Sequence, residues 1–429
     1  MFKKSSAKER PSHWANSTGT AFKNPWPSAN PPTWSEAFEL SFPFSLYPNL
    51  HNHSHARPIE VVAPDWGEAS LKAQGIDQGA QDCVIGTWLG HAGVLVEFTP
   101  LTCSTVEKEK SVYLLFDPIV SERAGPTAYT GPSRIRKSPC RISELPGCDA
   151  VFISHNHYDH LDLATVRAVT ENFPGTMWFV PLGNGKWLAN TGVEGELIQE
   201  MDWWESKEGS FAHGKFQSLP EGVNTGTSFK ISCTPAQHNS GRSGLDGGST
   251  LWSGWAIERF TTTTTTTTND SIQQTRKGAI YHAGDTGYRR TTKSPITCPA
   301  FQEIGNRFHG FDLSFIPIWR GGSLGFISYM GLRLSHHDIP SALHCSPTDA
   351  LEIHRDVKSR NTIGVHFGTF IGSENESFDA LIEFCEASER VGIGRLDGDG
   401  VGENGRAGTL DLGGSFAVVV GGEEDGMCN

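Results

Sequence analysis

Short apolar runs recur along the chain from Asp82 onward, and each is closed by Gly, Pro, Asp or His. Runs of this length that end in turn residues are typical of buried β-strands. The predicted strands lie in VIGTWLGHAGVLVEF, SVYLLFDPI, DAVFIS, TMWFVPL, SFKISCTPA, LWSGWAIERF, GAIYHAGD, LSFIPIW, TIGVHFGTF and GSFAVVVGG. The pattern therefore predicts a domain built mainly from strands.

Helical periodicity stands out in two segments between these runs, DLATVRAVT at 162–170 and PTDALEIHRDVK at 347–358. In the second, Ser346 is the expected N-cap, Pro347 takes the first helical position and Asp349 lies in the first turn. Many strands with few helices, joined by hairpins and by crossovers, predict an α+β fold with αββα layers.

Residues 1–81 differ in composition, being rich in Pro, Asn, Ser and Trp without a sustained strand or helix period. We expect an extended N-terminal arm that packs on the main body, because a solvated tail seldom carries so many aromatic residues. Residues 82–421 would form the main domain and 422–429 a flexible tail. Eight consecutive threonines open a low-complexity insertion at 261–277, which we predict to be a disordered hairpin tip.

Charge and cysteine content argue against several functional classes. The formal net charge of −13 disfavours nonspecific binding to nucleic acid. Nine scattered cysteines without a Cys-x-x-Cys pair argue against a disulfide framework or a cysteine-rich zinc module. The chain shows no long uninterrupted apolar segment, so we expect an intracellular protein, cytoplasmic or peripherally associated with a membrane. Organelle targeting by the first residues stays open as an alternative.

The stretch SHNHYDHL, residues 154–161, crowds histidines and an aspartate between a predicted strand and a predicted helix. His155 and His157, two apart in an extended loop, can share one metal ion, and Asp159 and His160 can turn to a second. Imidazole nitrogen and carboxylate oxygen suit zinc. The alternative is a polar loop without a metal, which explains less of the pattern.

HNHYDH is similar to the His-x-His-x-Asp-His signature of the metallo-β-lactamase superfamily. That resemblance implies an αββα metallo-β-lactamase sandwich and further ligands at later strand ends, where His238, Asp285 and His366 stand. It implies two Zn²⁺ ions. The first would be held by His155, His157 and His238, and the second by Asp159, His160 and His366, with Asp285 bridging.

The likeness extends to NPWPS, GTWLGHAGVLVE, DPIVSERAGPTAYTGP, ISELPGCDAVFISHNHYDHLD, HAGDTGY and VHFGTF, which resemble N-acyl-phosphatidylethanolamine-hydrolysing phospholipase D. It covers most of residues 24–372, and departs at the threonine run, at PIWRGGSLGFISYMGLRLSHHD and after Ser373. The resemblance implies a phosphodiesterase that releases N-acylethanolamine and phosphatidic acid through a metal-bridging hydroxide. The substrate's acyl chains would lie near the GGSLGFISYMGL segment.

Further roles follow from the same resemblance. Asp117 would orient a ligand histidine, the alternative being a turn residue before Pro118. His344 would lie near the substrate phosphate and join Asp159 and Asp285 as a catalytic residue, the alternative being a surface histidine. We expect His91 and His282 to be structural.

Several other sequence features are weaker candidates for a functional site. The histidines at 51, 53 and 55 and the His336-His337-Asp338 triplet lack a strand to fix them, and the single Asp-Thr-Gly at 285–287 cannot supply the two carboxylates of an aspartic protease. Residues 134–141 hold three arginines and a lysine, Arg134, Arg136, Lys137 and Arg141, which form either a membrane contact or a solvated loop.

The expected partners are a phospholipid substrate and a peripheral membrane surface, with a homodimer also open and no nucleic acid. Two other functions remain as alternatives. The same site could hydrolyse a lactone, a thioester or a soluble phosphodiester, because one fold hosts many reactions. A binding module with a vestigial site is the non-enzymatic alternative.

Overall fold

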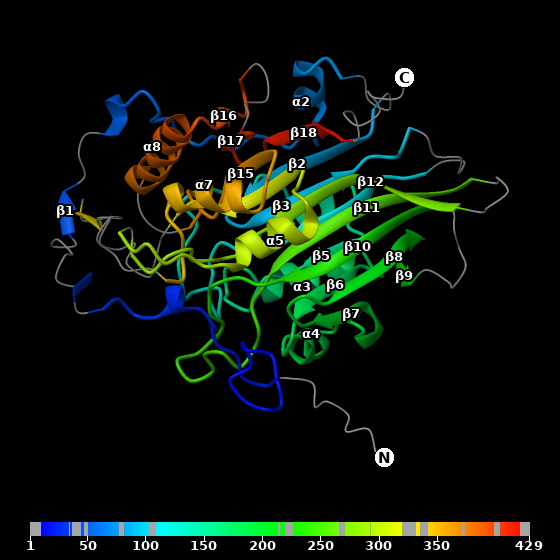
Figure 1. Cartoon of the computed structure of the whole chain (residues 1–429), viewed down its shortest axis with the longest axis horizontal. Helices are drawn as coiled ribbons and strands as arrows, with labels where there is room; N and C mark the ends of the chain where they lie inside the picture. Colours follow the sequence, from blue (N-terminus) through cyan, green and yellow to red (C-terminus); the bar gives the residue numbers. More distant parts are fainter. Residues whose placement is uncertain are drawn as a thin grey trace.

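Two β-sheets packed against each other, with helices on their outer sides, form the body of the molecule (Figure 1). This computed structural model describes residues 10–33, 35–36, 44–46, 50–76, 81–102, 109–212, 215–218, 226–265, 271–291, 293–319, 332–334, 342–370, 374–398 and 404–420. The sheets meet closely, since a Cβ atom placed on Gly86 of one would lie 2.6 Å from the Phe315 ring of the other. This is the αββα sandwich that the strand pattern predicts.

The first sheet has seven strands in the order β18-β2-β3-β4-β5-β6-β7. Its β18 to β4 half is antiparallel and its β4 to β7 half is parallel. The strands are β2 (Cys83–Gly90), β3 (Gly93–Phe98), β4 (Val112–Phe116), β5 (Ala150–Phe152), β6 (Met177–Pro181), β7 (Ile198–Met201) and β18 (Ser415–Val419).

The second sheet has nine strands in the order β16-β17-β15-β13-β12-β11-β10-β8-β9. It is parallel from β16 to β12 and antiparallel from β12 to β9. The strands are β8 (Ser206–Ala212), β9 (Lys215–Ser218), β10 (Gly226–Thr234), β11 (Gly254–Thr265), β12 (Ser271–His282), β13 (Leu313–Pro317), β15 (Asn361–Val365), β16 (Gly394–Arg395) and β17 (Arg406–Gly408). A separate pair joins β1 (Phe44–Leu46) to β14 (Leu332–Leu334).

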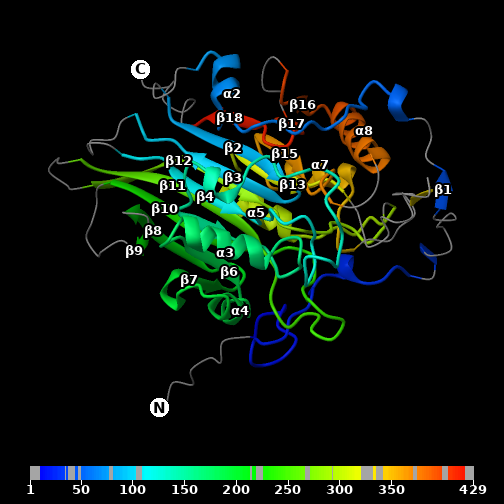
Figure 2. The same cartoon turned by 180° about the vertical axis from the view of Figure 1, so that it is seen from behind.

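Helices cover the outer faces of the sheets. Helices α3 (Leu163–Asn172) and α4 (Gly185–Asn190) lie over the β5 to β7 part of the first sheet (Figure 2). Beside the second sheet lie α5 (Ala300–Phe308), α7 (Pro347–Asp356) and α8 (Glu374–Val391), and α2 (Glu68–Ala73) packs on β18. Short 3₁₀ turns occupy Pro27–Ala29, Leu50–Asn52, Ile142–Glu144 and Gly195–Leu197.

Both predicted helices are confirmed, and their caps explain where they start. The Asp162 carboxylate accepts a hydrogen bond from the Thr165 amide at 2.9 Å and begins α3. The Ser346 hydroxyl accepts one from the Asp349 amide at 3.0 Å and begins α7. Each cap satisfies an amide that has no partner inside the helix. The sequence pattern does not single out α5 or α8.

The threonine run differs from its prediction. Thr261–Thr265 continue β11 and pair with residues 271–275 of β12. Threonine is β-branched and favours the extended backbone, so a repeat of it can extend a hairpin. The prediction of a disordered insertion is therefore wrong for these two segments, and residues 266–270 lie outside the described chain.

The N-terminal arm contacts the body over its described part. The Trp26 and Trp203 rings stack with centroids 5.3 Å apart, and His13 pairs with Asp202 at 2.7 Å. The Asn24 amide donates to the backbone oxygen of His238 at 2.7 Å. The arm thereby reaches the segment that carries a predicted metal ligand.

The basic run does not form one exposed patch. Arg134 donates to the backbone oxygens of Ser121 and Ile119, and burial lowers the pKa of its guanidinium to about 10. Arg136 donates to Gly368 and pairs with Glu374. These two arginines therefore have partners inside the fold, whereas Lys137 and Arg141 are exposed. Among the described residues, we find no helix with the length and apolar character of a membrane span.

Candidate metal centre

The predicted metal-binding loop, residues 155–160, follows the carboxyl end of β5 and ends just before α3. β5 is a central, fully buried strand between β4 and β6. The Trp255 indole donates to the backbone oxygen of Ile153 at 3.0 Å and so fixes the point where the loop starts. The loop therefore begins at a rigid edge of the first sheet.

Three strand ends of the second sheet reach the same place. His238 follows β10, Asp285 follows β12 and His366 follows β15. The approach is tight at Gly284, which has a φ of +62° and whose added Cβ would lie 2.6 Å from the Ser154 side chain. Glycine is the residue that tolerates both demands. The two sheets thus supply one shared site.

The structure brings all seven predicted ligands together. Ligand atoms of His155, His157 and His238 lie within 4.8 Å of one another, and so do those of Asp159, His160 and His366 together with His91. Asp285 lies between the groups, with carboxylate oxygens 3.2 Å from His160 Nε2, 3.0 Å from His366 Nε2 and 3.8 Å from His238 Nε2. The geometry forms two neighbouring clusters that share one carboxylate.

Hydrogen bonds on the far side of the rings fix which nitrogen faces the site. His160 donates from Nδ1 to Asp117 at 2.9 Å, which leaves Nε2 toward Asp285. Asp117 also accepts from the Ser154 amide at 2.7 Å and from its hydroxyl at 2.6 Å. His238 donates from Nδ1 to the backbone oxygen of Leu343 at 2.8 Å. Such partners orient imidazole for metal binding.

Burial and charge separate the protonation states of the cluster. Burial lowers the pKa of His155 and of His238 well below the usual value, so both stay neutral. Burial alone would lower the pKa of His366 too, but the nearby carboxylates of Asp285 and Asp159 outweigh burial and raise this pKa to about 9. Burial opposes ionisation of Asp285, yet nearby imidazoles hold its pKa well below the usual value.

Unsatisfied atoms test whether the residues fit a metal. His160 Nε2, His366 Nε2 and both carboxylate oxygens of Asp285 are buried without a hydrogen bond of good geometry to any described residue. Buried polar atoms without partners are costly and rare in native proteins. Nitrogen and carboxylate oxygen atoms facing one space are the donor set of a zinc-type metal. The residues therefore fit the metal centre that the sequence implies.

Backbone strain concentrates at the centre. His91, Asp117 and His366 have positive φ values of 54°, 38° and 62°, although none is glycine. Residues in this region persist where the surrounding structure holds them, and they cluster at functional sites. The fold therefore tolerates strain to place these side chains.

His91 contributes more than the sequence suggests. Its Nε2 atom lies 2.8 Å from Asp159 Oδ2, and its backbone oxygen accepts from the His366 amide at 2.8 Å. Burial lowers the pKa of the His91 imidazole to about 4, so it is neutral and donates to the carboxylate. The expectation that His91 is merely structural misses these contacts with two predicted ligands. His282, by contrast, donates to the backbone oxygen of Ala92 at 3.0 Å, as a structural histidine would.

A cavity of about 550 Å³ opens onto the clusters. His344 lines it, with Nδ1 3.8 Å from Asp285 Oδ2 and its ring centroid 4.9 Å from that of His238. Trp319 and Phe370 supply apolar wall. Residues 320–331, to which the sequence assigns part of the acyl channel, lie outside the described chain. The His336-His337-Asp338 triplet lies outside it as well.

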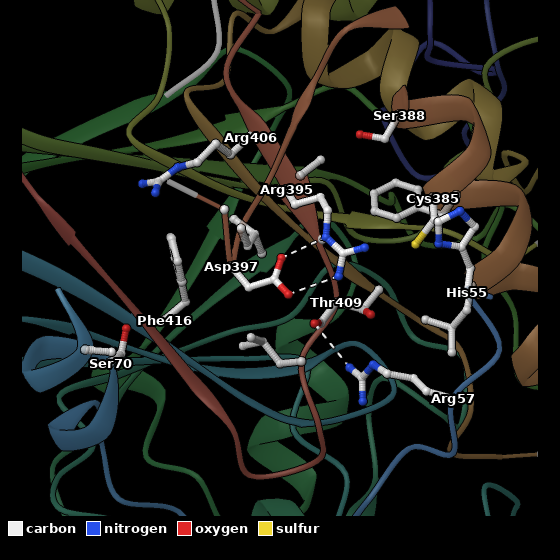
Figure 3. A pocket seen from close by; sticks show the side chains of 18 of the residues that line it. His55, Arg57, Ser70, Cys385, Ser388, Arg395, Asp397, Arg406, Thr409 and Phe416 are labelled. Atoms are coloured by element: carbon white, nitrogen blue, oxygen red, sulfur yellow. Dashed lines mark hydrogen bonds and ion pairs between the residues drawn. The ribbon is translucent and has the colours of Figure 1, made fainter. Parts of the chain in front are cut away.

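A larger cavity of about 910 Å³ lies between α2, α8 and β17 and shares no lining residue with the metal centre (Figure 3). Its charged side chains already have partners, since Arg395 donates to both oxygens of Asp397 and Arg57 donates to Asp411. Two of the discounted histidines lie nearby, with His53 3.2 Å from Glu386 and His55 3.3 Å from Glu389. Size alone does not make this cavity the reactive site.

Comparison with known proteins agrees with the centre. Residues 113–367 match the family described as the beta-lactamase superfamily domain. The N-acyl-phosphatidylethanolamine-hydrolyzing phospholipase D 1 of Caenorhabditis elegans is 33% identical over 382 residues, which cover 86% of this chain and 88% of the relative. The mitochondrial N-acyl-phosphatidylethanolamine-hydrolyzing phospholipase D of Saccharomyces cerevisiae is 29% identical over 69% of this chain and 50% of its own length.

Among solved structures, the isothiocyanate hydrolase from Delia radicum gut bacteria aligns with a TM-score of 0.46 at 15% identity, over 78% of this chain and 100% of that one. The family match spans more than half of this chain, and the nematode relative is similar over most of both lengths. The chain therefore belongs to the N-acyl-phosphatidylethanolamine-hydrolysing phospholipase D family within the metallo-β-lactamase superfamily of metal-dependent hydrolases.

Proposed function

We propose that this protein is a dizinc phosphodiesterase of phospholipase D type, which hydrolyses N-acyl-phosphatidylethanolamine to N-acylethanolamine and phosphatidic acid. One observation carries the proposal: two clusters of ligand atoms share the buried carboxylate of Asp285 at the floor of a cavity. The substrate named for the nematode relative supplies the substrate class.

In this proposal the first ion is held by His155, His157 and His238, and the second by Asp159, His160 and His366, with Asp285 between them. Zinc ions bound there would lower the pKa of a water molecule and stabilise negative charge on a phosphoryl oxygen. The chain's own part is to hold imidazole nitrogens and ionised carboxylates in place. Asp117 and His91 fix the orientation of His160 and Asp159.

His344 would act directly on the substrate. It borders the cavity beside Asp285, and burial lowers the pKa of its imidazole to about 4. A neutral imidazole carries one N–H group, which can donate to a phosphoryl oxygen as charge develops there. Trp319 and Phe370 offer apolar surface to the lipid part of the substrate.

The test combines metal content with lipid turnover. Elemental analysis of the wild type should give about two zinc ions per chain, and vesicles of N-acyl-phosphatidylethanolamine should release N-acylethanolamine. Asp285→Asn should lose metal and activity. The matched control is Asp312→Asn, because Asp312 is also a buried carboxylate but accepts from the Ala279 amide away from the clusters.

Two outcomes would redirect the proposal. Zinc-loaded wild type without lipid turnover would reject the substrate and favour a lactone, a thioester or a soluble phosphodiester. A wild type that binds no metal would favour a non-enzymatic binding module.

A further inference from the structure

A short loop after His238 contacts the metal-binding loop. Asp246 accepts hydrogen bonds from the amides of Arg242, at 3.0 Å, and Ser243, at 2.7 Å, and the Gly248 amide donates to the Ser240 backbone oxygen at 3.1 Å. These internal bonds hold the loop, residues 240–248, in a fixed turn. The turn presents the Arg242 side chain to the metal-binding loop.

The Arg242 side chain makes three contacts in and directly after that loop. Its Nη1 atom donates to the backbone oxygen of Asn156 at 3.0 Å and to that of Leu161 at 2.8 Å. Its guanidinium lies over the Tyr158 ring at 4.0 Å, and the Trp187 ring lies 4.7 Å from it as well. One side chain thus contacts two residues of the loop, Asn156 and Tyr158, and Leu161 directly after it.

The neighbouring backbone adds a fourth link. The Gly241 amide donates to the Asn156 side-chain oxygen at 2.7 Å. Asn156 stands between His155 and His157, and Tyr158 stands between His157 and Asp159. The contacts therefore alternate with the predicted ligands along the chain.

The chemistry of these contacts suits a clamp, by which we mean the Arg242 side chain holding the metal-binding loop in place. The loop lies outside the sheet ladders, so its carbonyl groups need other partners. Guanidinium donors give stronger hydrogen bonds to them than neutral groups do, and the planar group also stacks on aromatic rings. Burial lowers the pKa of Arg242, but its guanidinium remains charged at neutral pH.

We propose that Arg242 is a positioning residue that holds the metal-binding loop in its ligating conformation, so that metal affinity depends on it. The proposal rests on the proposed metal centre, but not on the identity of the substrate. A loop held in place loses less conformational entropy when it binds a metal ion. Removing the clamp should therefore weaken metal binding more than it weakens the fold.

The test is zinc affinity of the metal-free protein, measured by competition with a chromophoric chelator, with thermal unfolding of the metal-free form recorded alongside. Arg242→Met should weaken zinc binding by about 10- to 100-fold, as loss of groups that orient ligands does elsewhere. Arg242→Lys, which keeps the charge and donors but loses the planar stacking group, should recover part of that affinity.

Arg307→Met is the matched control. Arg307 also stacks on a tryptophan, Trp204 at 5.0 Å, and donates to the backbone oxygen of that residue at 3.3 Å. It lies on α5, and among the described residues its contacts are with Trp204 and not with the clusters. Its variant should bind zinc like the wild type. Arg242→Met with wild-type zinc affinity would overturn the proposal, whatever its melting temperature.

A second variant tests the same proposal if Arg242→Met does not fold. Tyr158→Leu keeps the arginine and removes the ring beneath it, and we expect zinc affinity to fall by about two- to thirtyfold. Unchanged affinity in that variant would also reject the clamp. A wild type that binds no zinc would reject the metal centre itself, which separates the two failures.

Discussion

His160 donates a hydrogen bond from Nδ1 to the Asp117 carboxylate at 2.9 Å, and neither side chain has any exposed surface. Asp117 simultaneously accepts from the amide and the hydroxyl of Ser154, at the start of the metal-binding loop. The same carboxylate therefore joins the end of β4 to the loop and aims one imidazole at Asp285. This contact favours the orienting role over that of a plain turn residue.

Asp117→Asn should weaken metal binding by about 10- to 100-fold. Asparagine can adopt the backbone of this position, whose φ is +38°, but its amide cannot accept all the hydrogen bonds that the carboxylate accepts. Zinc titration of the metal-free variant measures the change. The control is Asp149→Asn, because Asp149 accepts from the Tyr113 amide at the opposite end of β4 and β5. Equal zinc affinity in both variants would contradict the orienting role.

His91→Asn should reduce the metal content or affinity of the cluster that contains Asp159. The variant removes the hydrogen bond from Nε2 to Asp159, and asparagine tolerates the φ of +54° found at this position. We expect about a tenfold or greater loss of affinity. The control is His309→Asn, since His309 is an exposed histidine with a φ of +57° away from the clusters. Two zinc ions bound as in the wild type would show that His91 is dispensable.

The sequence reveals the centre because its signal is local. HNHYDH lies in one loop after one strand, and the remaining predicted ligands lie within four residues of the ends of apolar runs that proved to be strands. His91 and His282 show the limit of this reasoning, since both stand at the end of such runs. Only the fold turns His91 toward Asp159 and His282 toward a backbone oxygen. The pattern of residues along the chain does not indicate which partner each histidine contacts.

The helices show a similar limit. α3 and α7 can be predicted from the sequence because a capping residue precedes a short periodic segment in each. α8 buries Ser377, Asp379 and Ser388 together with its apolar residues, so polar letters interrupt the hydrophobic period. Arg242 is hidden for another reason: its partners are backbone carbonyl groups about eighty residues away, at separations of 86 and 81.

His344→Gln should lower kcat by about 10²- to 10³-fold without changing metal content, because it removes the proposed donor to charge that develops on the substrate. Metal analysis and vesicle kinetics on the same preparation separate the two effects. His354→Gln is the control. His354 is a buried histidine of α7 that contacts the Thr362 hydroxyl at 2.7 Å, so its loss should affect stability and spare kcat. A metal-loaded His344→Gln enzyme with wild-type kcat would remove His344 from the mechanism.

Glu97→Gln should change the pH dependence of stability in a defined direction. Burial raises the pKa of Glu97 above its ordinary value, while Ser111 donates to its carboxylate at 2.6 Å. The folded state therefore binds the proton more tightly than the unfolded state, whose pKa is about 4.3. The stability that this group contributes is present below that pH and falls as pH rises through the folded pKa.

Glutamine cannot ionise, so the variant should gain stability relative to the wild type as the pH increases from about 4.3 toward neutrality. Urea denaturation of metal-free protein at several pH values in this window measures the difference. Using metal-free protein separates this effect from the pH dependence of metal binding, which requires deprotonated ligands. A difference between variant and wild type that stays constant with pH would show that Glu97 ionises as easily in the folded chain as in the unfolded one.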